Sequence, residues 1–341
     1  MPIGVLLLNL GGPDSLQAVR PFLYNLFSDR QIIRLGPPFL QKPLAWLIST
    51  LRSKKTEKMY SLIGGKSPII EITQAQAKAL EEALNKQPGI KSRKSTPPPG
   101  AVSFKVYTGM RYWHPFIEHV IPMIHKDGIK KVIVLSLYPQ YSVTTSGSSV
   151  SQVNKVLPGY PIDIDCVASW HNHPLYIEAL ADVIEKGIES FSGSSGAPHS
   201  PSADEVHVLF SAHSLPQKII DEGDPYVTET VGTIHEVTRT FPVKWSLSYQ
   251  SKSGPVKWLE PSTEETLKRL AGEGIRNVLV VPISFVSDHI ETLYEIDILY
   301  KKMAGELGIN LRRSGSLNTH PKFIEALQDI VMTRVREKGW G

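Results

Sequence analysis

Cysteine is nearly absent from this 341-residue chain, and its scarcity excludes several kinds of site. The single Cys166 cannot form a disulfide within the chain. No Cys-x-x-Cys pair supplies ligands for a structural zinc ion or an iron–sulfur cluster. A reducing compartment therefore fits the composition, and we expect a cytoplasmic protein.

Long apolar runs and a strong excess of charge are also missing. The apolar run at residues 3–8 is too short to span a bilayer, and no basic stretch precedes it, so we expect neither a signal peptide nor a membrane anchor. The net charge of only +4 does not favour nucleic-acid binding. The 41% of apolar residues indicates a folded chain, and its length predicts two domains, because one core rarely organises more than about 250–300 residues.

Apolar runs of strand length alternate with helical patterns along the whole sequence. This order predicts parallel sheets flanked by helices. The expected strands are residues 4–10, 104–108, 131–137 and 162–167 in the first half, and 206–210, 244–247 and 277–283 in the second. The clearest helical patterns are residues 67–84, 225–239 and 262–271.

The two halves of the sequence resemble each other. The run GIKKVIVLSL at residues 128–137 matches GIRNVLVVPI at residues 274–283, which predicts two copies of one α/β unit. In this alignment Val5 corresponds to Val208, and Val106 corresponds to Trp245. We expect one domain over residues 1–170 and a second over residues 171–341, whose last helix could pack back on the first domain.

The first copy is much longer than the second between its first two strands. Part of the excess is the segment at residues 30–66, which we interpret as a lid beside a cleft. Its apolar stretch at residues 39–48 precedes a basic cluster of Arg52, Lys54, Lys55 and Lys58. This cluster is either a solvated helix face or a surface for an anionic ligand or lipid headgroup. Polar stretches at residues 91–100 and 192–201 are expected to be surface loops.

Ionisable residues follow the predicted strands of the second half. His213 comes just after one apolar run, and Asp288, His289, Glu291 and Glu295 come after another. Ligands of parallel sheets bind at the carboxyl ends of the strands, so these residues could face one another. Glu291 and Glu295 share one face of a helix and, with the imidazoles, could ligate a divalent metal or relay protons. The alternative is an acidic first turn that complements the helix dipole.

Aromatic and polar residues gather at the same predicted end of the sheets, where they could form a flat apolar slot or simply pack the core. Familiar nucleotide and hydrolase motifs are missing: the sequence has no phosphate-binding loop, dinucleotide fingerprint or nucleophile elbow. The slot candidates are Tyr60, Arg111, Tyr112, Tyr141, Trp258 and Phe285.

Seven motifs in order resemble the ferrochelatase family, whose members insert ferrous iron into a porphyrin. They are LNLGGP (8–13), YSLIGGKSP (60–68), GMRY (109–112), LYPQYS (137–142), SAHSLP (211–216), YQSKSGP (249–255) and SDHIETLYE (287–295). The resemblance implies two similar Rossmann-like, chelatase-type domains with a cleft between them. It also implies that His213 is the active-site histidine and Glu291 its partner acid, both handling the metal.

The resemblance extends to further roles. Asp288, His289 and Glu295 match an acidic track for metal or protons. The residues that it places at the porphyrin slot are Leu10, Arg111, Tyr112, Trp258 and Phe285, and those that it places near the propionates are Arg52 and Tyr60. Tyr141, one of the slot candidates above, completes the predicted porphyrin contacts. Animal members carry a leader and a cysteine-ligated [2Fe–2S] cluster, so a chain with one cysteine resembles the bacterial, cluster-free type. No permanently bound cofactor is expected, and Fe²⁺ is a substrate.

The chemistry of this reaction fits the residues. A porphyrin loses two pyrrole protons as iron enters, which calls for a base, and an imidazole can accept a proton near neutral pH. A stiff slot that favours a buckled ring would stabilise a shape close to the transition state. Because porphyrins partition into membranes, the lid could rest on the inner face of a membrane without crossing it.

Other readings of the sequence stay open. The macrocycle could be coproporphyrin III instead of protoporphyrin IX, or the metal could be cobalt. A protein of another class, a two-domain binding protein without catalysis, also suits duplicated α/β lobes. Neither the oligomeric state nor the division of labour between His213 and Glu291 follows from the sequence.

Overall fold

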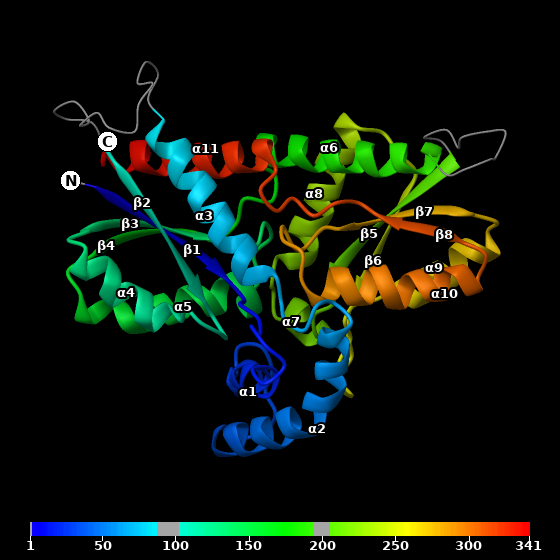
Figure 1. Ribbon diagram of the computed structural model, residues 1–341, viewed down its shortest axis with the longest axis horizontal. Helices are drawn as coiled ribbons and strands as arrows, with labels where there is room; N and C mark the ends of the chain where they lie inside the picture. Colours follow the sequence, from blue (N-terminus) through cyan, green and yellow to red (C-terminus); the bar gives the residue numbers. More distant parts are fainter. Residues whose placement is uncertain (1, 87–101, 194–204) are drawn as a thin grey trace. The chain divides into compact units, whose positions relative to one another are not determined.

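The computed structural model describes residues 2–86, 102–193 and 205–341 (Figure 1). The predicted loop at residues 91–100 lies outside these ranges, as does most of the one at 192–201. The chain divides into two compact units. Unit 1 comprises Met1–Trp170 together with Asn318–Gly341, and unit 2 comprises His171–Leu317. The last helix thus belongs to the same unit as the first strand.

Unit 1 is built on a four-stranded parallel sheet with the strand order β2-β1-β3-β4. All seven residues of β1 are buried, which its unbroken apolar sequence explains, since strands of a covered parallel sheet face apolar layers on both sides. The strands are β1 (Ile3–Asn9), β2 (Phe104–Met110), β3 (Lys131–Ser136) and β4 (Asp163–Val167).

Helices cover both faces of this sheet (Figure 1). Helices α3 (Ile69–Asn85) and α11 (Pro321–Glu337) pack together on one face. On the other face, α4 (Ile117–Lys126) and α5 (Ser148–Val156) contribute Ile121, Ile124 and Val153 to the core. The shorter helical segments are the π-helix η2 (Val143–Gly147) and the 3-10 turn η3 (Leu157–Gly159).

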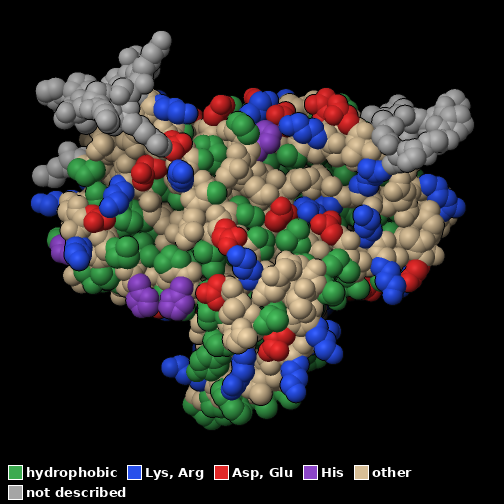
Figure 2. All heavy atoms as spheres, in the orientation of Figure 1, with side chains coloured by type: hydrophobic (Ala, Val, Ile, Leu, Met, Phe, Trp, Pro, Cys, Tyr) green, Lys and Arg blue, Asp and Glu red, His purple; other side chains and the backbone are tan. Residues whose placement is uncertain are grey.

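The lid segment, residues 30–66, folds mainly as helix. It contains the 3-10 turn η1 (Pro38–Leu40) and α2 (Gln41–Ser61), and α2 packs against α1 (Val19–Ser28). Two cation–π contacts join the two helices, with Arg20 5.4 Å from the Trp46 ring and Arg52 5.4 Å from the Phe27 ring. Several large apolar side chains of η1 and α2 face solvent, as the spheres over α2 in Figure 2 show.

Unit 2 repeats the plan of unit 1, with the strand order β6-β5-β7-β8. On one face α6 (Pro174–Glu189) packs beside α8 (Tyr226–Thr240), and the other face carries α9 (Thr263–Gly272), the π-helix η6 (Glu291–Tyr300) and α10 (Lys301–Glu306) (Figure 1). Two short helical segments are η4 (Ser190–Gly193) and α7 (Gln217–Asp221). The strands are β5 (Val206–His213), β6 (Trp245–Gln250), β7 (Asn277–Pro282) and β8 (Asn310–Arg313).

The strand registers of the two units correspond. Val5 pairs with Val106 in unit 1 and Val208 with Trp245 in unit 2, as the internal repeat predicts. The predicted fold class, two α/β units with parallel sheets flanked by helices, is therefore confirmed. Strand β8 was not predicted, because its sequence NLRR is short and half of it is charged. Strand β5 runs three residues beyond the predicted end at Phe210, so His213 is its last residue.

Candidate active site

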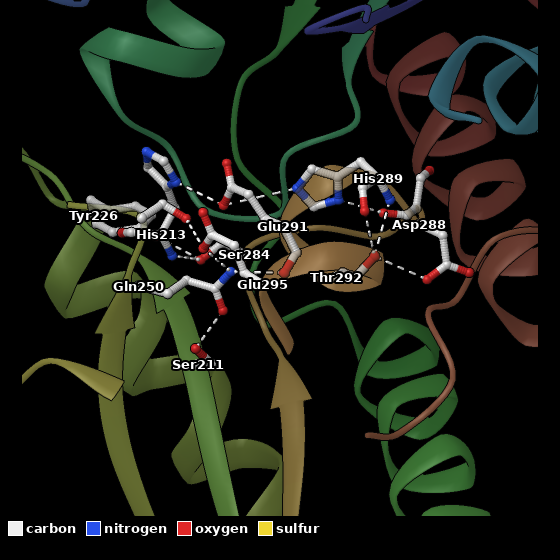
Figure 3. A network of polar contacts seen from close by, with 12 residues as sticks. Ser211, His213, Tyr226, Gln250, Ser284, Asp288, His289, Glu291, Thr292 and Glu295 are labelled. Carbon is white, nitrogen blue, oxygen red and sulfur yellow. Dashed lines mark hydrogen bonds and ion pairs between the residues drawn. The ribbon is translucent and has the colours of Figure 1, made fainter. Parts of the chain in front are cut away.

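The ionisable residues of the second half meet at one edge of the unit 2 sheet (Figure 3). His213 ends β5, Gln250 ends β6, and Glu291 begins η6, which follows the loop after β7. Strands of a parallel sheet direct their carboxyl ends to the same edge, which is why residues so far apart in sequence converge. All of these residues belong to unit 2.

His213 and Glu291 form the central contact. The Nδ1 atom of His213 lies 2.9 Å from Oε2 of Glu291, and their side chains are 31% and 13% exposed. Burial alone would raise the pKa of the Glu291 carboxyl, but the positive charge and hydrogen bond of His213, aided by His289, hold that pKa below its ordinary value. Burial lowers the pKa of His213, and the charge of Glu291 more than offsets this, so it lies above its ordinary value. The pair therefore favours an ionised carboxylate beside an imidazole of increased basicity.

A second carboxyl group, Glu295, lies one turn further along η6. The Ser251 hydroxyl donates a hydrogen bond of 2.6 Å to Oε2 of Glu295, and the Gln250 amide donates one of 3.3 Å to the same atom. Burial, followed by the negative charge of Glu291, raises the pKa of Glu295 to about 7. Two neighbouring carboxyl groups of one helix thus differ sharply in proton affinity. Glu291 is suited to bind a cation, and Glu295 is suited to accept and release a proton.

Ser251 reaches Glu295 from an unusual backbone conformation. Its φ angle is 67°, in the left-handed region that few residues other than glycine adopt. Gln250 is fixed from its other end, since its Oε1 atom accepts a 2.6 Å hydrogen bond from Ser211. Both residues lie in the YQSKSGP motif, yet sequence reasoning gave them no role, because a serine and a glutamine carry no signal of the carboxyl group that they contact.

Hydrogen bonds to the backbone hold His213 in place. The hydroxyl of Tyr226 donates to the His213 carbonyl oxygen over 2.9 Å, and the Ser284 hydroxyl accepts from the His213 amide over 3.0 Å. The two hydroxyls are themselves 2.6 Å apart. Sequence reasoning missed Tyr226 and Ser284. The position of Ser284 directly after a predicted strand was the signal that could have found it.

Figure 3 shows Glu291 between the imidazole rings of His213 and His289. The Nδ1 atom of His289 lies 3.1 Å from the Ser287 carbonyl oxygen, which only accepts hydrogen bonds, so this nitrogen carries the proton. The buried Nε2 atom has no hydrogen-bond partner among the described residues and lies 3.9 Å from Oε2 of Glu291. The Phe285 ring packs against both imidazoles, with centroids 6.0 Å from His213 and 4.1 Å from His289. The predicted residues His213, Phe285, His289, Glu291 and Glu295 thus form one cluster.

Asp288 faces a different set of partners. Its Oδ1 atom accepts hydrogen bonds from Arg313 (2.9 Å), Ser316 (2.8 Å) and Thr292 (3.2 Å). These contacts connect the start of η6 to the end of β8. The role of Asp288 in passing metal or protons stays a prediction, but the carboxylate has a structural task that the sequence did not indicate.

In unit 1, Arg111 and Tyr112 belong to a separate buried network. The Oδ2 atom of Asp29 accepts hydrogen bonds from Arg111 (2.7 Å), Tyr112 (2.7 Å) and Ser148 (2.6 Å). Burial would raise the pKa of Asp29, but Ser148 and Arg111 keep it below its ordinary value. Tyr112 is only 2% exposed. Its predicted contact with porphyrin requires its surroundings to open, whereas Arg111 is partly exposed.

The other predicted porphyrin residues are scattered over the two units. Leu10 follows the end of β1 and is partly buried, and Tyr60 is buried near the end of α2. The Tyr141 hydroxyl approaches Gly147 so closely that a Cβ there would lie 2.9 Å away, so a larger residue at 147 would require Tyr141 to shift. Trp258 pairs with Pro216, and its buried indole nitrogen has no hydrogen-bond partner among the described residues.

The candidate site offers few ligands to a metal ion. The described residues contain no group of three or more histidine, cysteine or acidic side chains arranged to hold one. His213 and Glu291 themselves supply two ligands, and a metal held by two side chains keeps open positions, which suits an ion that is handed on. In the described part of the chain, no helix has the length and apolarity of a membrane span.

Comparison with a solved structure supports the fold. The structure described as SirB from Bacillus subtilis with Fe3+ aligns with a TM-score of 0.54 and 14% sequence identity, covering 99% of this chain and 98% of that one. At this identity the likeness concerns the fold alone, a chelatase-type pair of α/β units, in agreement with the sequence-based expectation.

Sequence comparison identifies the family. The ferrochelatase family profile matches residues 2–335. A ferrochelatase from Synechocystis sp. is 48% identical, covering 98% of this chain and 83% of its own length. One from Geobacter metallireducens is 51% identical, and the alignment covers 96% of each chain. The chain belongs to the ferrochelatase family, which confirms the resemblance inferred from its seven motifs.

Proposed function

We propose that the protein inserts Fe²⁺ into protoporphyrin IX, giving protoheme and releasing two protons. The observation that carries this proposal is the contact of 2.9 Å between His213 and Glu291 at the carboxyl edge of the unit 2 sheet. Membership of the ferrochelatase family supports the same reaction.

His213 is the base in this proposal. Because Nδ1 faces the Glu291 carboxylate, the proton of the neutral imidazole resides there and the Nε2 lone pair is available. When Nε2 takes a pyrrole proton, the nearby carboxylate stabilises the imidazolium, as in other carboxylate–histidine pairs. Two such transfers, one for each pyrrole N–H, balance the entry of one doubly charged iron ion.

Glu291 handles the incoming Fe²⁺, together with His213. Its lowered pKa keeps the carboxyl group ionised at neutral pH, and the ionised form is the one that binds a divalent cation. Glu295, with a pKa of about 7, alternates between its two forms at neutral pH and carries protons away from the site. His289 and Asp288 complete the track for metal or protons.

The porphyrin contacts inferred from the family extend this proposal. Phe285 packs on the His213 ring, where an aromatic side chain supports a flat macrocycle, and Trp258 supplies a second aromatic surface. Arg52 and Tyr60 are assigned to the propionates. The remaining assigned contacts are Leu10, Arg111, Tyr112 and Tyr141. No permanently bound cofactor and no nucleic acid take part.

Anaerobic mixing of the protein with protoporphyrin IX and Fe²⁺ tests the reaction, because conversion to heme changes the absorbance spectrum. Many heme molecules per protein molecule are expected, whereas porphyrin binding without heme would favour a non-catalytic binding protein. Coproporphyrin III and Co²⁺ in parallel reactions test the nearest alternatives. The protein prefers protoporphyrin IX and Fe²⁺ if the proposal holds.

We also propose a cytoplasmic protein whose lid segment rests on the inner face of a membrane. Phe39 and Leu51 are 75% and 73% exposed, and Trp46 is exposed nearby. Phe39 lies in η1, whereas Trp46, Leu51 and the basic cluster of residues 52–58 lie on α2. This combination of apolar and basic side chains is typical of interfacial helices. Flotation with anionic liposomes tests it: Phe39→Ser with Leu51→Ser should abolish binding, and Met123→Ser, at an exposed residue of α4, should not.

A further inference from the structure

The π-helix η6 spans ten residues, Glu291–Tyr300, and carries both Glu291 and Glu295. Most π-helical segments are single turns inserted in α-helices, because the i→i+5 pattern is less favourable than the α-helical one. A π-helix of this length needs tertiary contacts to hold its winding. It also continues directly into α10, so the same chain adopts the ordinary winding a few residues later.

Arg313 contacts both η6 and the loop that precedes it. Its guanidinium donates from Nε and Nη2 to the two carboxylate oxygens of Asp297, over 2.9 Å and 2.8 Å, and from Nη1 to Oδ1 of Asp288 over 2.9 Å. The Arg313 side chain is only 12% exposed. Such a two-pronged contact fixes orientation as well as distance.

The two aspartates occupy different places. Asp297 lies within η6, whereas Asp288 lies three residues before Glu291, the first residue of η6, in the loop that enters the helix. One guanidinium contacts both carboxylates, so it joins a residue in the middle of the π-helix to the loop from which the helix begins.

The arginine acts from a rigid support. It is the last residue of β8, where it is paired with Val280 of β7, and the next residue donates its amide to the Val280 carbonyl oxygen. At the Asp288 end, the contact continues into the site, since Thr292 bonds both Asp288 and the backbone of His289.

We propose that Arg313 is a positioning residue: by holding Asp297 of η6 and Asp288 of the preceding loop together, it fixes η6 in place and thereby the directions in which Glu291 and Glu295 point. It contacts neither Glu291 nor Glu295. The link to turnover rests on the proposed function, and the link to the order of η6 does not.

Two measurements on three variants test this inference. Arg313→Met removes both the charge and the hydrogen-bond donors of the guanidinium, and Arg313→Lys keeps only the charge. Asp297→Asn weakens only the contact of Arg313 with η6 and leaves its contact with Asp288. Arg269→Met is the control, because Arg269 of α9 also joins a carboxylate, that of Glu273 just after the helix, to a strand serine, Ser246, without contacting η6.

The first measurement is steady-state kinetics. A displacement of about 1 Å at a catalytic group can reduce the rate about 100-fold. We expect Arg313→Met to lower kcat about 10- to 100-fold with the KM for porphyrin changed less than about threefold, and Arg313→Lys and Asp297→Asn to fall between it and wild type. Arg269→Met should retain wild-type kcat. A wild-type kcat in Arg313→Met, or a rise in KM alone, would overturn the proposal.

The second measurement is amide hydrogen exchange over residues 291–300 without substrate. Exchange should become at least about tenfold faster in Arg313→Met and stay unchanged in Arg269→Met. Unchanged exchange in Arg313→Met would overturn the proposal even if the wild-type protein proved to have no chelatase activity. If Arg313→Met fails to fold, Asp297→Asn decides the matter, and wild-type values for both its kcat and its exchange would refute the inference.

Discussion

The two units share strand order and register, yet they place different residues at the edge where chemistry would occur. Counting along the chain from the register-matched Val5 and Val208, Leu10 of unit 1 takes the place of His213 of unit 2. Counting from the matched residues of β3 and β7, Thr145 takes the place of Glu291. One unit thus carries a base and an acid where its repeat carries an apolar residue and a hydroxyl.

The polar networks behind these positions also differ. In unit 1, Arg111, Tyr112 and Ser148 all donate to Asp29, so a fixed anion is fully paired with donors. In unit 2, the corresponding end of β6 contacts Glu295, a carboxyl group whose pKa is about 7. The first arrangement keeps one protonation state at physiological pH, whereas the second changes state there. The repeat therefore supplies a common frame, and the titratable side chains of the candidate site distinguish unit 2 from unit 1.

The largest effect expected is the loss of the base. His213→Ala should lower kcat by about 10²- to 10⁴-fold, the usual contribution of a general base, while porphyrin still quenches intrinsic fluorescence at the same concentration. Near-normal turnover at saturating porphyrin would show that a different group takes the pyrrole protons.

The two glutamates of η6 should differ in importance. In the proposed reaction, Glu291→Gln removes the charge that stabilises the imidazolium and binds Fe²⁺, so we expect kcat to fall about 100-fold or more. Glu295→Gln, in the same proposal, removes only a proton carrier that solvent can replace, so a loss of about tenfold or less is expected. Equal losses of kcat in parallel assays would contradict the distinct roles proposed for the two carboxyl groups.

Glu295 should also make the stability of the protein depend on pH. Its folded-state pKa of about 7 is higher than the ordinary value of 4.5, so the folded protein binds the extra proton between these pH values. Stability from this group is then present at low pH and is lost as pH rises towards and through 7. In denaturant unfolding, Glu295→Gln should therefore be more stable than wild type by about 1–3 kcal/mol at pH 8 and nearly equal at pH 4.5. A difference independent of pH would contradict the raised pKa.

The smallest effects are expected in the unit 1 counterparts. Thr145→Val and Ser149→Ala alter the places that correspond, in sequence count, to Glu291 and Glu295, and each should change kcat by less than about threefold. Both variants should be assayed beside Glu291→Gln. A loss of 100-fold in either one would mean that both units, and not unit 2 alone, supply catalytic groups.

Most of the fold followed from the sequence, because apolar runs and an internal match report burial and duplication directly. Strand β8 was missed since Arg312 and Arg313 disguise a strand at the edge of the sheet. The π-helical winding of η6 was missed too, because the i,i+4 spacing of its glutamates suits either kind of helix. That winding depends on tertiary contacts, which no local pattern reports.

The sequence indicated the ionisable residues that meet at the candidate site, but not the residues that support them. His213 and Glu291 stood out because ionisable groups after apolar strands are unusual. The supports Tyr226, Gln250 and Ser251 look like ordinary helix, strand and loop residues until the fold brings them to the site. Hydrogen bonds between residues far apart in sequence leave no trace in a single chain.

The central claim is that His213 and Glu291 act together in one catalytic step, and a double-mutant cycle tests it most directly. Residues that share one step give losses that do not multiply. We predict that His213→Ala with Glu291→Gln inserts Fe²⁺ within about threefold of the slower single variant. A double variant slowed by the product of the two single losses would contradict the account.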